Sequence, residues 1–402
     1  MAKELFLRIL RCAIQGEVFQ SETEITEDVW TQIFELGRIH KVLPLIFDSA
    51  YRTLKESGRD ISAIRKLSKQ MMFSQAAHTA SFINILEKLY KNHVPAVVVK
   101  GITCRRLYKN PDLRVSSDED ILVDTPHLSI CEKLLLDEGF SKTTPSSESR
   151  YEHSYRRADG LHIEVHRTLF SDENKVFTKW NKLFENAETT TFLYEHSSCP
   201  IVTFSPDYNL LYLILHALKH FINTGVGIRQ ICDIATFSKA YQNEINWDFI
   251  SLKLSESGGL TFSKAIFSLA DSHLGFDSGK FLPEIFLSDI PDTTPLLRDI
   301  LDGGVYGTAT LSRAHSRSFT ENAAQGKKPS VLSRLFPSPN SIKSRYGYAK
   351  NPLLLPVAYC HRVIRYTSEL IKTKNNGPVS AIKIGARRVE LLKFYSIIET
   401  EK

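Results

Sequence analysis

Residues 114–124 read RVSSDEDILVD, which places Asp118, Glu119 and Asp120 directly before the apolar run 121–123. Aspartate is disfavoured in strands and neighbouring carboxylates repel one another, so something must compensate both costs. Because side chains alternate along a strand, Asp118 and Asp120 are predicted to share one face. A divalent cation would neutralise this pair, and Mg²⁺ is commonly held by one or two carboxylates together with substrate phosphates.

A third acid lies on a later predicted strand, HIEVH at 162–166. Ile163 and Val165 are expected to face the core, which places Glu164 on the opposite face, beside the first two acids. Three acids from two strands can hold two metal ions about 3.5–4 Å apart, which stabilise the attacking and leaving oxygens of a displacement at phosphorus. The sequence therefore predicts a site for two Mg²⁺ ions, with Mn²⁺ as the alternative.

Residues upstream of the acids offer contacts for phosphate groups. The run HVPAVVVKG, 93–101, is typical of a buried strand that ends in a tight turn. Gly101 would let a phosphate approach the backbone, and Lys100 would supply a point charge. Arg114 precedes the acids and is predicted to hold a phosphate through two parallel hydrogen bonds.

The apolar pattern divides the chain into four parts. Residues 1–90 are predicted to be helical, 91–200 to form a compact α/β unit of mixed strands, 201–302 to be helical, and 303–402 to form a long basic loop and a helical extension. Within the α/β unit, strands are expected at 93–101, 118–123, 151–157 and 160–170, with a helix at 126–140.

Turn and cap residues mark some of the boundaries. Asp159 and Gly160 are predicted to form the turn between the last two of these strands. Ser205 is the expected N-cap of the first helix after the α/β unit, with Pro206 at its first position.

The composition is that of a globular protein of more than one folding unit. The chain has 402 residues, of which 42% are hydrophobic and 24% charged. No apolar stretch approaches the ~20 residues of a membrane-spanning helix, and the first residues lack a signal-peptide cleavage site, so we expect a cytoplasmic protein. The six cysteines are scattered without a C-x-x-C pair, which argues against a zinc ribbon or a disulfide framework.

The positive charge is concentrated in the last quarter of the chain. Residues 303–402 hold 17 Lys and Arg against five Asp and Glu, whereas residues 1–302 hold 34 against 40. Such a segment suits contact with a phosphorylated acceptor, an anionic membrane surface or RNA. A solvated charged face is the alternative.

Several stretches together resemble one known family. They are VVVKG (97–101), LRVSSDEDILV (113–123), HIEVH (162–166), LHALKHF (215–221), GIRQICDIATF (227–237), LFPSPNSIKSRY (335–346) and NPLLLPVAYCHRVIRY (351–366). In this order they resemble the uncharacterised nucleotidyltransferase family of the DNA polymerase beta-type superfamily, some of whose members occur among polysaccharide-biosynthesis proteins. The resemblance covers most of the chain after about residue 85 and implies an α+β fold, with a small mixed-sheet nucleotidyltransferase domain flanked by helical N- and C-terminal regions.

The resemblance also implies an activity and its residues. The activity would be metal-dependent transfer of a nucleoside monophosphate from an NTP to an unidentified acceptor, with Asp118, Asp120 and Glu164 as catalytic metal ligands. The implied nucleotide contacts are Lys100, Gly101, Arg114, Ser117 and His166. Two alternatives stay open: a non-catalytic scaffold or acceptor-binding protein in glycan assembly, and an RNA-directed nucleotidyltransferase.

Two positions depart from the superfamily pattern. Ile102 follows Gly101 where Gly-Ser or Gly-Gly is usual, and Glu119 stands between the paired acids where an apolar residue is usual. A glutamate that faces the core needs a partner, for which Arg105 and Arg106 are the candidates. These departures favour the non-catalytic alternative, whereas the three intact acids favour an enzyme.

The histidines allow other interpretations. His162, Glu164 and His166 alternate on one strand face and could bind zinc, although His166 is better explained by orienting Glu164, contacting the nucleotide or packing. His216 and His220 have the spacing of a zinc-protease pair but lack its glutamate. Lys219 between them suggests a polar face turned toward the pocket.

One further pair lies four residues apart on a predicted helix. Arg229 and Asp233 have the spacing of a surface ion pair. For these two residues we expect a structural role rather than a catalytic one.

Overall fold

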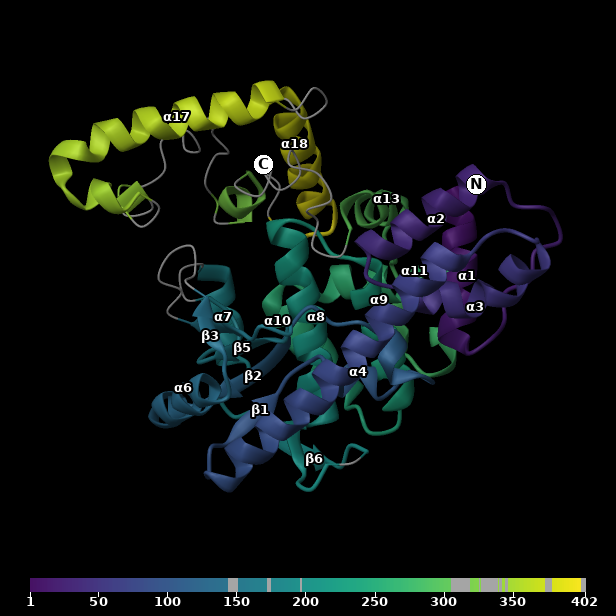
Figure 1. Cartoon of the computed structure of the whole chain (residues 1–402), viewed down its shortest axis with the longest axis horizontal. Helices are drawn as coiled ribbons and strands as arrows, with labels where there is room; N and C mark the ends of the chain where they lie inside the picture. Colours follow the sequence, from purple (N-terminus) through teal and green to yellow (C-terminus); the bar gives the residue numbers. More distant parts are fainter. Residues whose placement is uncertain are drawn as a thin grey trace.

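A computed structural model describes residues 1–143, 151–171, 175–195, 197–304, 319–324, 326, 339, 342–343, 346–372 and 378–398 (Figure 1). These residues form a seven-stranded mixed sheet with helical regions before and after it in the chain. The fold is therefore α+β, as predicted.

Four helices form the N-terminal region of the chain. They are α1 (Ala2–Gln15), α2 (Glu27–Ile39), α3 (Leu43–Glu56) and α4 (Ser62–Lys91). Helix α2 begins after Thr26 with Glu27 and Asp28 in its first turn, where negative charge complements the helix dipole. Helix α4 extends for 30 residues because neither Pro nor Gly interrupts it.

The sheet contains β1 (Ala96–Val98), β2 (Glu119–Val123), β3 (Ser141–Thr143), β4 (Glu152–Arg156), β5 (His162–His166), β6 (Thr189–Phe192) and β7 (Ile201–Phe204). Their order across the sheet is β3-β4-β5-β2-β1-β7-β6. Strand β2 runs antiparallel to β1 and parallel to β5. The two strands that carry the predicted acids are therefore direct neighbours.

The sequence predicted four of these strands and missed three. Strands β1, β2, β4 and β5 lie where expected, and Gly160 adopts a positive φ of 92° in the turn between β4 and β5. The missed strands β3 and β6 are short, exposed and built largely of Ser, Thr and Lys, so they lack an apolar pattern. Strand β7 pairs with β1, so the sheet continues to Phe204, past the predicted unit end at 200.

One face of the sheet packs against helices and forms part of the core. Helix α4 and helix α6 (Leu128–Asp137) bury Phe82 and Leu135 against the sheet residues Ile121 and Ile163. The 3-10 turns η1 (Pro111–Leu113) and η2 (Thr125–His127) flank β2, and the short helix α5 (Ile102–Arg105) follows β1. The opposite face bears the polar side chains of Asp120 and Glu164, together with Val97 and Leu122, which pack against the larger core.

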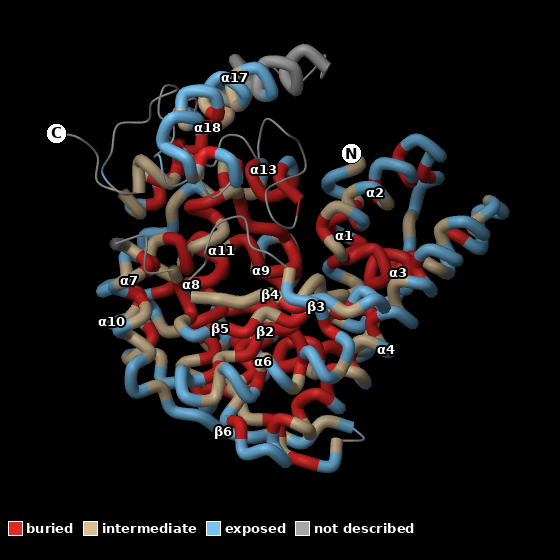
Figure 2. Tube along the Cα trace, turned by 60° about the vertical axis from the view of Figure 1, so that its left-hand side comes forward, coloured by how far each residue is buried: buried red, intermediate tan, exposed pale blue. Residues whose placement is uncertain are grey.

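Helix α7 (Lys175–Lys182) lies in the chain between β5 and β6. A second helical region follows the sheet and contributes most of a large core. It comprises α8 (Pro206–Asn223), α9 (Ile228–Ala240), α10 (Trp247–Ser257), α11 (Leu260–Leu274), η3 (Ser278–Lys280), α12 (Glu284–Leu287) and α13 (Thr294–Gly303). Ser205 is the N-cap of α8 and Pro206 its first residue, as predicted. Figure 2 shows α8, α9 and α11 mostly buried, and α11 also packs against α1 of the N-terminal region.

The C-terminal region contains η4 (Gly347–Lys350), η5 (Pro352–Leu354), α17 (Leu355–Lys372) and α18 (Pro378–Phe394). The long loop predicted after residue 303 lies largely outside the described residues. Helix α18 is fixed to the body by the buried side chains of Leu392 and Tyr395 and by Arg388, which donates to the carbonyls of Phe221 and Asn223. Helix α17 extends away from the body at the top left of Figure 1. Among the helices described, none is both long and apolar enough to cross a membrane.

Candidate functional site

A polar cavity of about 600 Å³ lies between helix α8 and the face of the sheet opposite to the one that packs against α4 and α6. Its wall consists mainly of acids, bases and histidines from five stretches of the chain: Lys41, His78, Lys100, Ser116, Ser117, Asp118, Glu152, Arg156, Gly160, His162, Glu164, His216, Lys219 and His220. Such a concentration of ionisable groups in one cavity makes it the candidate functional site of this protein.

The strand register brings the three predicted acids together. In the parallel pair β2–β5, Asp120 lies directly opposite Glu164, and Asp118 precedes Asp120 by two residues on the same face. Glu119 lies opposite Ile163 and points to the other face of the sheet. The alternation that the sequence predicted for this stretch is therefore present.

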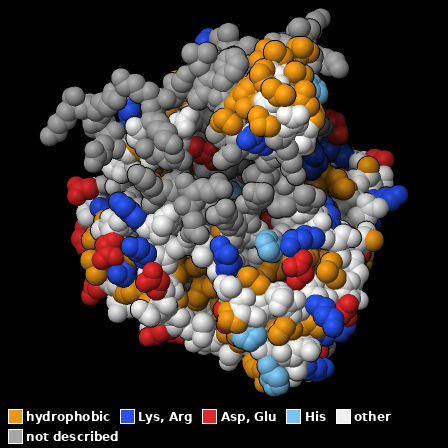
Figure 3. Space-filling model, turned by 90° about the vertical axis from the view of Figure 1, so that its left-hand side faces the viewer, with side chains coloured by type: hydrophobic (Ala, Val, Ile, Leu, Met, Phe, Trp, Pro, Cys, Tyr) orange, Lys and Arg blue, Asp and Glu red, His pale blue; other side chains and the backbone are white. Residues whose placement is uncertain are grey.

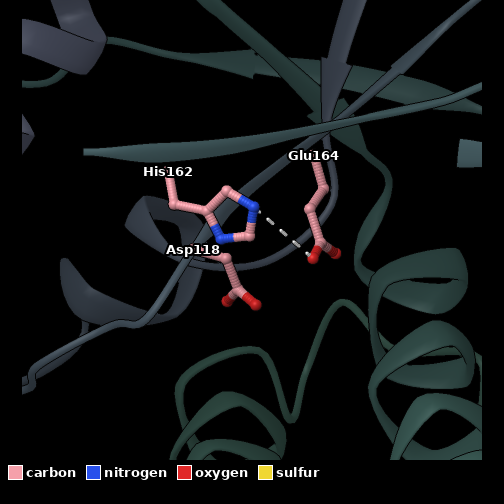
Figure 4. A group of neighbouring side chains, drawn as sticks. All are labelled: Asp118, His162 and Glu164. Carbon is pink, nitrogen blue, oxygen red and sulfur yellow. Dashed lines mark ion pairs between the residues drawn. The ribbon is translucent and has the colours of Figure 1, made fainter. Parts of the chain in front are cut away.

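Two groups of potential metal ligands share Glu164. The first consists of Asp118, His162 and Glu164, whose side chains point toward one another in Figure 4, and the second of Asp120, Glu164 and His166. In each group the ligand atoms lie within 4.8 Å of one another. Carboxylate and imidazole donors at this spacing fit a divalent cation. The predicted zinc set of His162, Glu164 and His166 is instead divided between the two groups.

The Lys100 ammonium lies between two of the acids. Its Nζ is 3.0 Å from Asp120 and 3.5 Å from Asp118, so it occupies the position of a cation between the carboxylates. Burial alone would lower the pKa of Lys100, but the two carboxylates outweigh it and hold that pKa well above its usual range. Lys100 thus stays charged, and its positive charge offsets part of the repulsion between the carboxylates of Asp118 and Asp120.

The acids differ in protonation because their surroundings differ. Burial opposes ionisation of Asp120, yet Lys100 and a hydrogen bond with His166 Nε2, 2.9 Å from Oδ1, hold the pKa of Asp120 well below its usual range. For Glu164, burial and the neighbouring carboxylates of Asp120 and Asp118 raise the pKa to about 9. Near neutral pH the site therefore holds an ionised Asp120 and a protonated Glu164.

This protonation makes the stability of the metal-free protein depend on pH. Between its ordinary value of 4.5 and the folded value of about 9, Glu164 keeps its proton in the fold and releases it on unfolding, so stability falls as pH rises through this range. We expect the Tm of the wild type in EDTA to fall more steeply from about pH 5 to about pH 9 than that of Glu164→Gln, whose amide is neutral throughout. Thermal unfolding followed by circular dichroism measures both slopes, and equal slopes would contradict the raised pKa.

The turn after β1 contains Gly101, and the side chain of Glu119 from β2 lies against it. Gly101 has a positive φ of 63°, and a Cβ at this position would overlap the Glu119 carboxylate. That carboxylate accepts a hydrogen bond from the Ile102 backbone N–H at 3.2 Å and forms a buried ion pair with Arg105. Arg105 is therefore the partner that Glu119 required. Arg106, the other candidate, instead lies over the ring of Phe192 at 3.9 Å.

Arg114 lies outside the cavity wall and has a different partner from the phosphate that the sequence predicted. Its guanidinium forms a buried ion pair with Asp233 of α9, which also accepts a hydrogen bond from the Tyr108 hydroxyl at 2.8 Å. The expected surface pair of Arg229 and Asp233 is wrong, because both residues are buried and Arg229 donates to the Val115 carbonyl at 2.5 Å. These contacts fix the loop before β2 to α9.

The remaining predicted residues line or border the cavity. Ser117 Oγ accepts a hydrogen bond of 2.6 Å from Lys41, a residue of the α2–α3 connection that the sequence did not indicate. His216 and His220 on α8 lie with their Nε2 atoms 3.3 Å apart, and burial together with nearby lysines lowers both pKa values, so both imidazoles are neutral. Lys219 also lines the cavity, which the sequence had suggested.

Besides Lys41, three further ionisable residues of the cavity wall gave no sequence signal. Glu152 and Arg156 belong to β4, and His78 belongs to α4, where its Nε2 lies 3.0 Å from the Asp159 carbonyl. Their participation depends on how α4 and β4 are placed around the sheet, which no local pattern encodes.

Comparison with known proteins gives one match to a family and one to a solved structure. A family described as uncharacterised nucleotidyltransferase matches residues 26–275, which extend from the start of α2 to the end of α11 and include the whole sheet. An antigenic nucleotidyltransferase-like protein from Paracoccidioides brasiliensis is 15% identical, with a TM-score of 0.32, over 53% of this chain and 93% of that one. No curated protein matches this chain.

Proposed function

The chain belongs to the uncharacterised nucleotidyltransferase family, and from this premise we propose that it transfers a nucleoside monophosphate from an NTP to an acceptor hydroxyl or phosphate. The observation that carries the proposal is the register of β2 and β5, which sets Asp120 beside Glu164 on the face that also bears Asp118. Divalent ions, Mg²⁺ or Mn²⁺, would supply neutralisation of the triphosphate and polarisation of the attacking and leaving oxygens when bound.

Each acid has a role that follows from its surroundings. Asp118 and Asp120 would hold the cations, and His166 orients Asp120 through the hydrogen bond to its Oδ1. Glu164 belongs to both ligand groups and activates the acceptor. It must lose its proton to do so, and the arrival of positive charge beside it favours that loss.

The basic residues of the cavity wall contact the phosphates. Lys41 beside Ser117, Arg156 of β4 and Lys219 of α8 all line the cavity and supply its positive charges. These side chains contact the phosphates in place of the backbone N–H of Ile102, because that N–H already donates a hydrogen bond to Glu119. Lys100, which now pairs with Asp120, would be available to a phosphate oxygen if cations took its place between the carboxylates.

An acceptor in polysaccharide biosynthesis is the finer part of the proposal, and its support is that some proteins of the family that the chain resembles occur among polysaccharide-biosynthesis proteins. The non-catalytic scaffold is the second candidate, favoured by the observation that Glu119 occupies the turn at Gly101 and Ile102. The two functions differ in whether the cavity binds nucleotide in a metal-dependent way.

Calorimetric titration of ATP, GTP, CTP and UTP, with Mg²⁺ and with EDTA, tests the proposal. We expect at least one NTP to bind only in the presence of Mg²⁺, and Lys219→Met to weaken that binding about 10- to 100-fold, since it removes a charge-assisted contact to phosphate. The control Lys280→Met changes an exposed lysine of η3 and should bind as the wild type does. If none of the four nucleotides binds to the wild type with Mg²⁺, the non-catalytic candidate is favoured.

A further inference from the structure

Residues 346–365, formed by η4, η5 and the first turns of α17, present an unusual surface that we call the apolar platform. Three of its large aliphatic side chains are more than half exposed: Leu353 at 85%, Ile364 at 66% and Val357 at 54%. Figure 3 shows hydrophobic side chains gathered at the top of the molecule, where this segment lies. Exposed aliphatic residues that cluster in this way are typical of an interaction surface rather than of ordinary surface scatter.

The helical spacing places these residues on one side. Val357, Cys360 and Ile364 are separated by three and four residues, so they lie along one stripe of α17, and all three are exposed. Leu353 precedes the stripe in η5. The other side of the helix packs inward, because Ala358 is buried together with Tyr346 and Ala349 in a small core of its own. The exposed stripe is therefore not needed to hold α17 in place.

The charged side chains of the platform itself all have one sign. Residues 346–365 include Lys350, Arg362 and Arg365 but no Asp or Glu, and the next acid along the chain is Glu369. The platform therefore combines aliphatic and basic side chains, in the quarter of the chain that carries the positive excess. A partner that matches it must be apolar in one layer and anionic in the adjacent one.

We propose that the apolar platform docks on the surface of an anionic lipid bilayer, with its aliphatic stripe at the boundary between headgroups and acyl chains and its arginines at the lipid phosphates. RNA is a poorer fit, because it would be recognised by stacking aromatic side chains rather than by Leu, Val and Ile. Helix α18 connects the platform to the body through Leu392 and Tyr395. This docking goes beyond the proposed transfer reaction and holds whether or not the chain transfers nucleotides.

Vesicle flotation with the full-length protein tests the proposal. We expect the wild type to float with vesicles of equimolar phosphatidylcholine and phosphatidylglycerol, and not with phosphatidylcholine alone, since the arginines need anionic headgroups. The triple variant Leu353→Asp/Val357→Asp/Ile364→Asp should lower the partition coefficient about 100-fold or more, because it removes the apolar contact and adds like charge to the lipid. The matched control Phe73→Asp/Leu193→Asp/Leu252→Asp changes three apolar side chains elsewhere that are also more than half exposed, and it should float as the wild type does.

The comparison of the two vesicle types on the wild type needs no variant, so the test does not depend on the folding of any substituted protein. Failure of the wild type to float with anionic vesicles would overturn the proposal, as would unchanged flotation of the platform variant. Binding of single-stranded RNA without any vesicle binding would also overturn it and would assign the basic quarter to nucleic acid. A failure of NTP binding leaves flotation unchanged, so the two proposals are tested separately.

Discussion

Asp120→Asn is expected to abolish metal-dependent nucleotide binding and transfer while the fold is kept. Asp120 is fully buried between Lys100 and His166, and asparagine keeps its size and an oxygen that can accept the His166 hydrogen bond. The variant loses the negative charge that a cation needs, and metal stabilisation of such a displacement is worth several kcal/mol, or about 10³-fold or more in rate. Calorimetry with Mg²⁺ and pyrophosphate release measure the two losses.

A matched control separates loss of the ligand from loss of a carboxylate in general. Asp124 lies directly after β2 and pairs with His127 at 2.6 Å, with about half of its side chain exposed. Asp124→Asn should bind nucleotide as the wild type does, and both variants should give the far-ultraviolet circular dichroism of the wild type. Full Mg²⁺-dependent binding by Asp120→Asn would refute the proposed function.

Arg114→Ala is expected to lower the free energy of unfolding by about 3–5 kcal/mol, because it leaves the Asp233 carboxylate buried without its counter-ion. Asp233 is about 5% exposed, so water cannot replace the guanidinium. The Tyr108 hydroxyl would remain as a donor, but one neutral hydrogen bond does not compensate a buried charge. Urea unfolding followed by tryptophan fluorescence measures the change.

Two further variants distinguish a buried ion pair from general loss of packing. Arg114→Leu/Asp233→Leu removes both charges and should recover much of the stability, as replacement of buried pairs by apolar residues often does. Arg38→Ala breaks an exposed pair with Glu35 and should cost about 0.5 kcal/mol or less. A loss with Arg114→Ala as small as that with Arg38→Ala would contradict the assigned role.

The placement of the three acids on one face of the sheet could be predicted because it follows from local rules. Alternation along β2 and β5 decides which face Asp118, Asp120 and Glu164 occupy, and apolar neighbours reveal that face. The same alternation turns the Glu119 side chain toward the core, so the sequence also showed that Glu119 needs a basic partner. Its partner Arg105 lies 14 residues away in the same turn region.

The errors concern contacts between distant parts of the chain. Arg114 and Asp233 are 119 residues apart, and Lys41 reaches Ser117 across 76 residues. An arginine before an acidic strand looks the same in sequence whether it faces a phosphate or a carboxylate of another helix. Only the packing of α9 and of the α2–α3 connection against the sheet decides between these partners.

Under the proposed function, the position of Lys100 has a consequence for the order in which ligands would enter the cavity. Asp118 and Asp120 already share an internal cation, so a free metal ion would have to compete with an ammonium that is held by both carboxylates. A metal–nucleotide complex would remove this competition, because its phosphate oxygens could pair with the ammonium while the carboxylates held the ion. On the proposed function, Lys100 would therefore favour metal that arrives together with nucleotide.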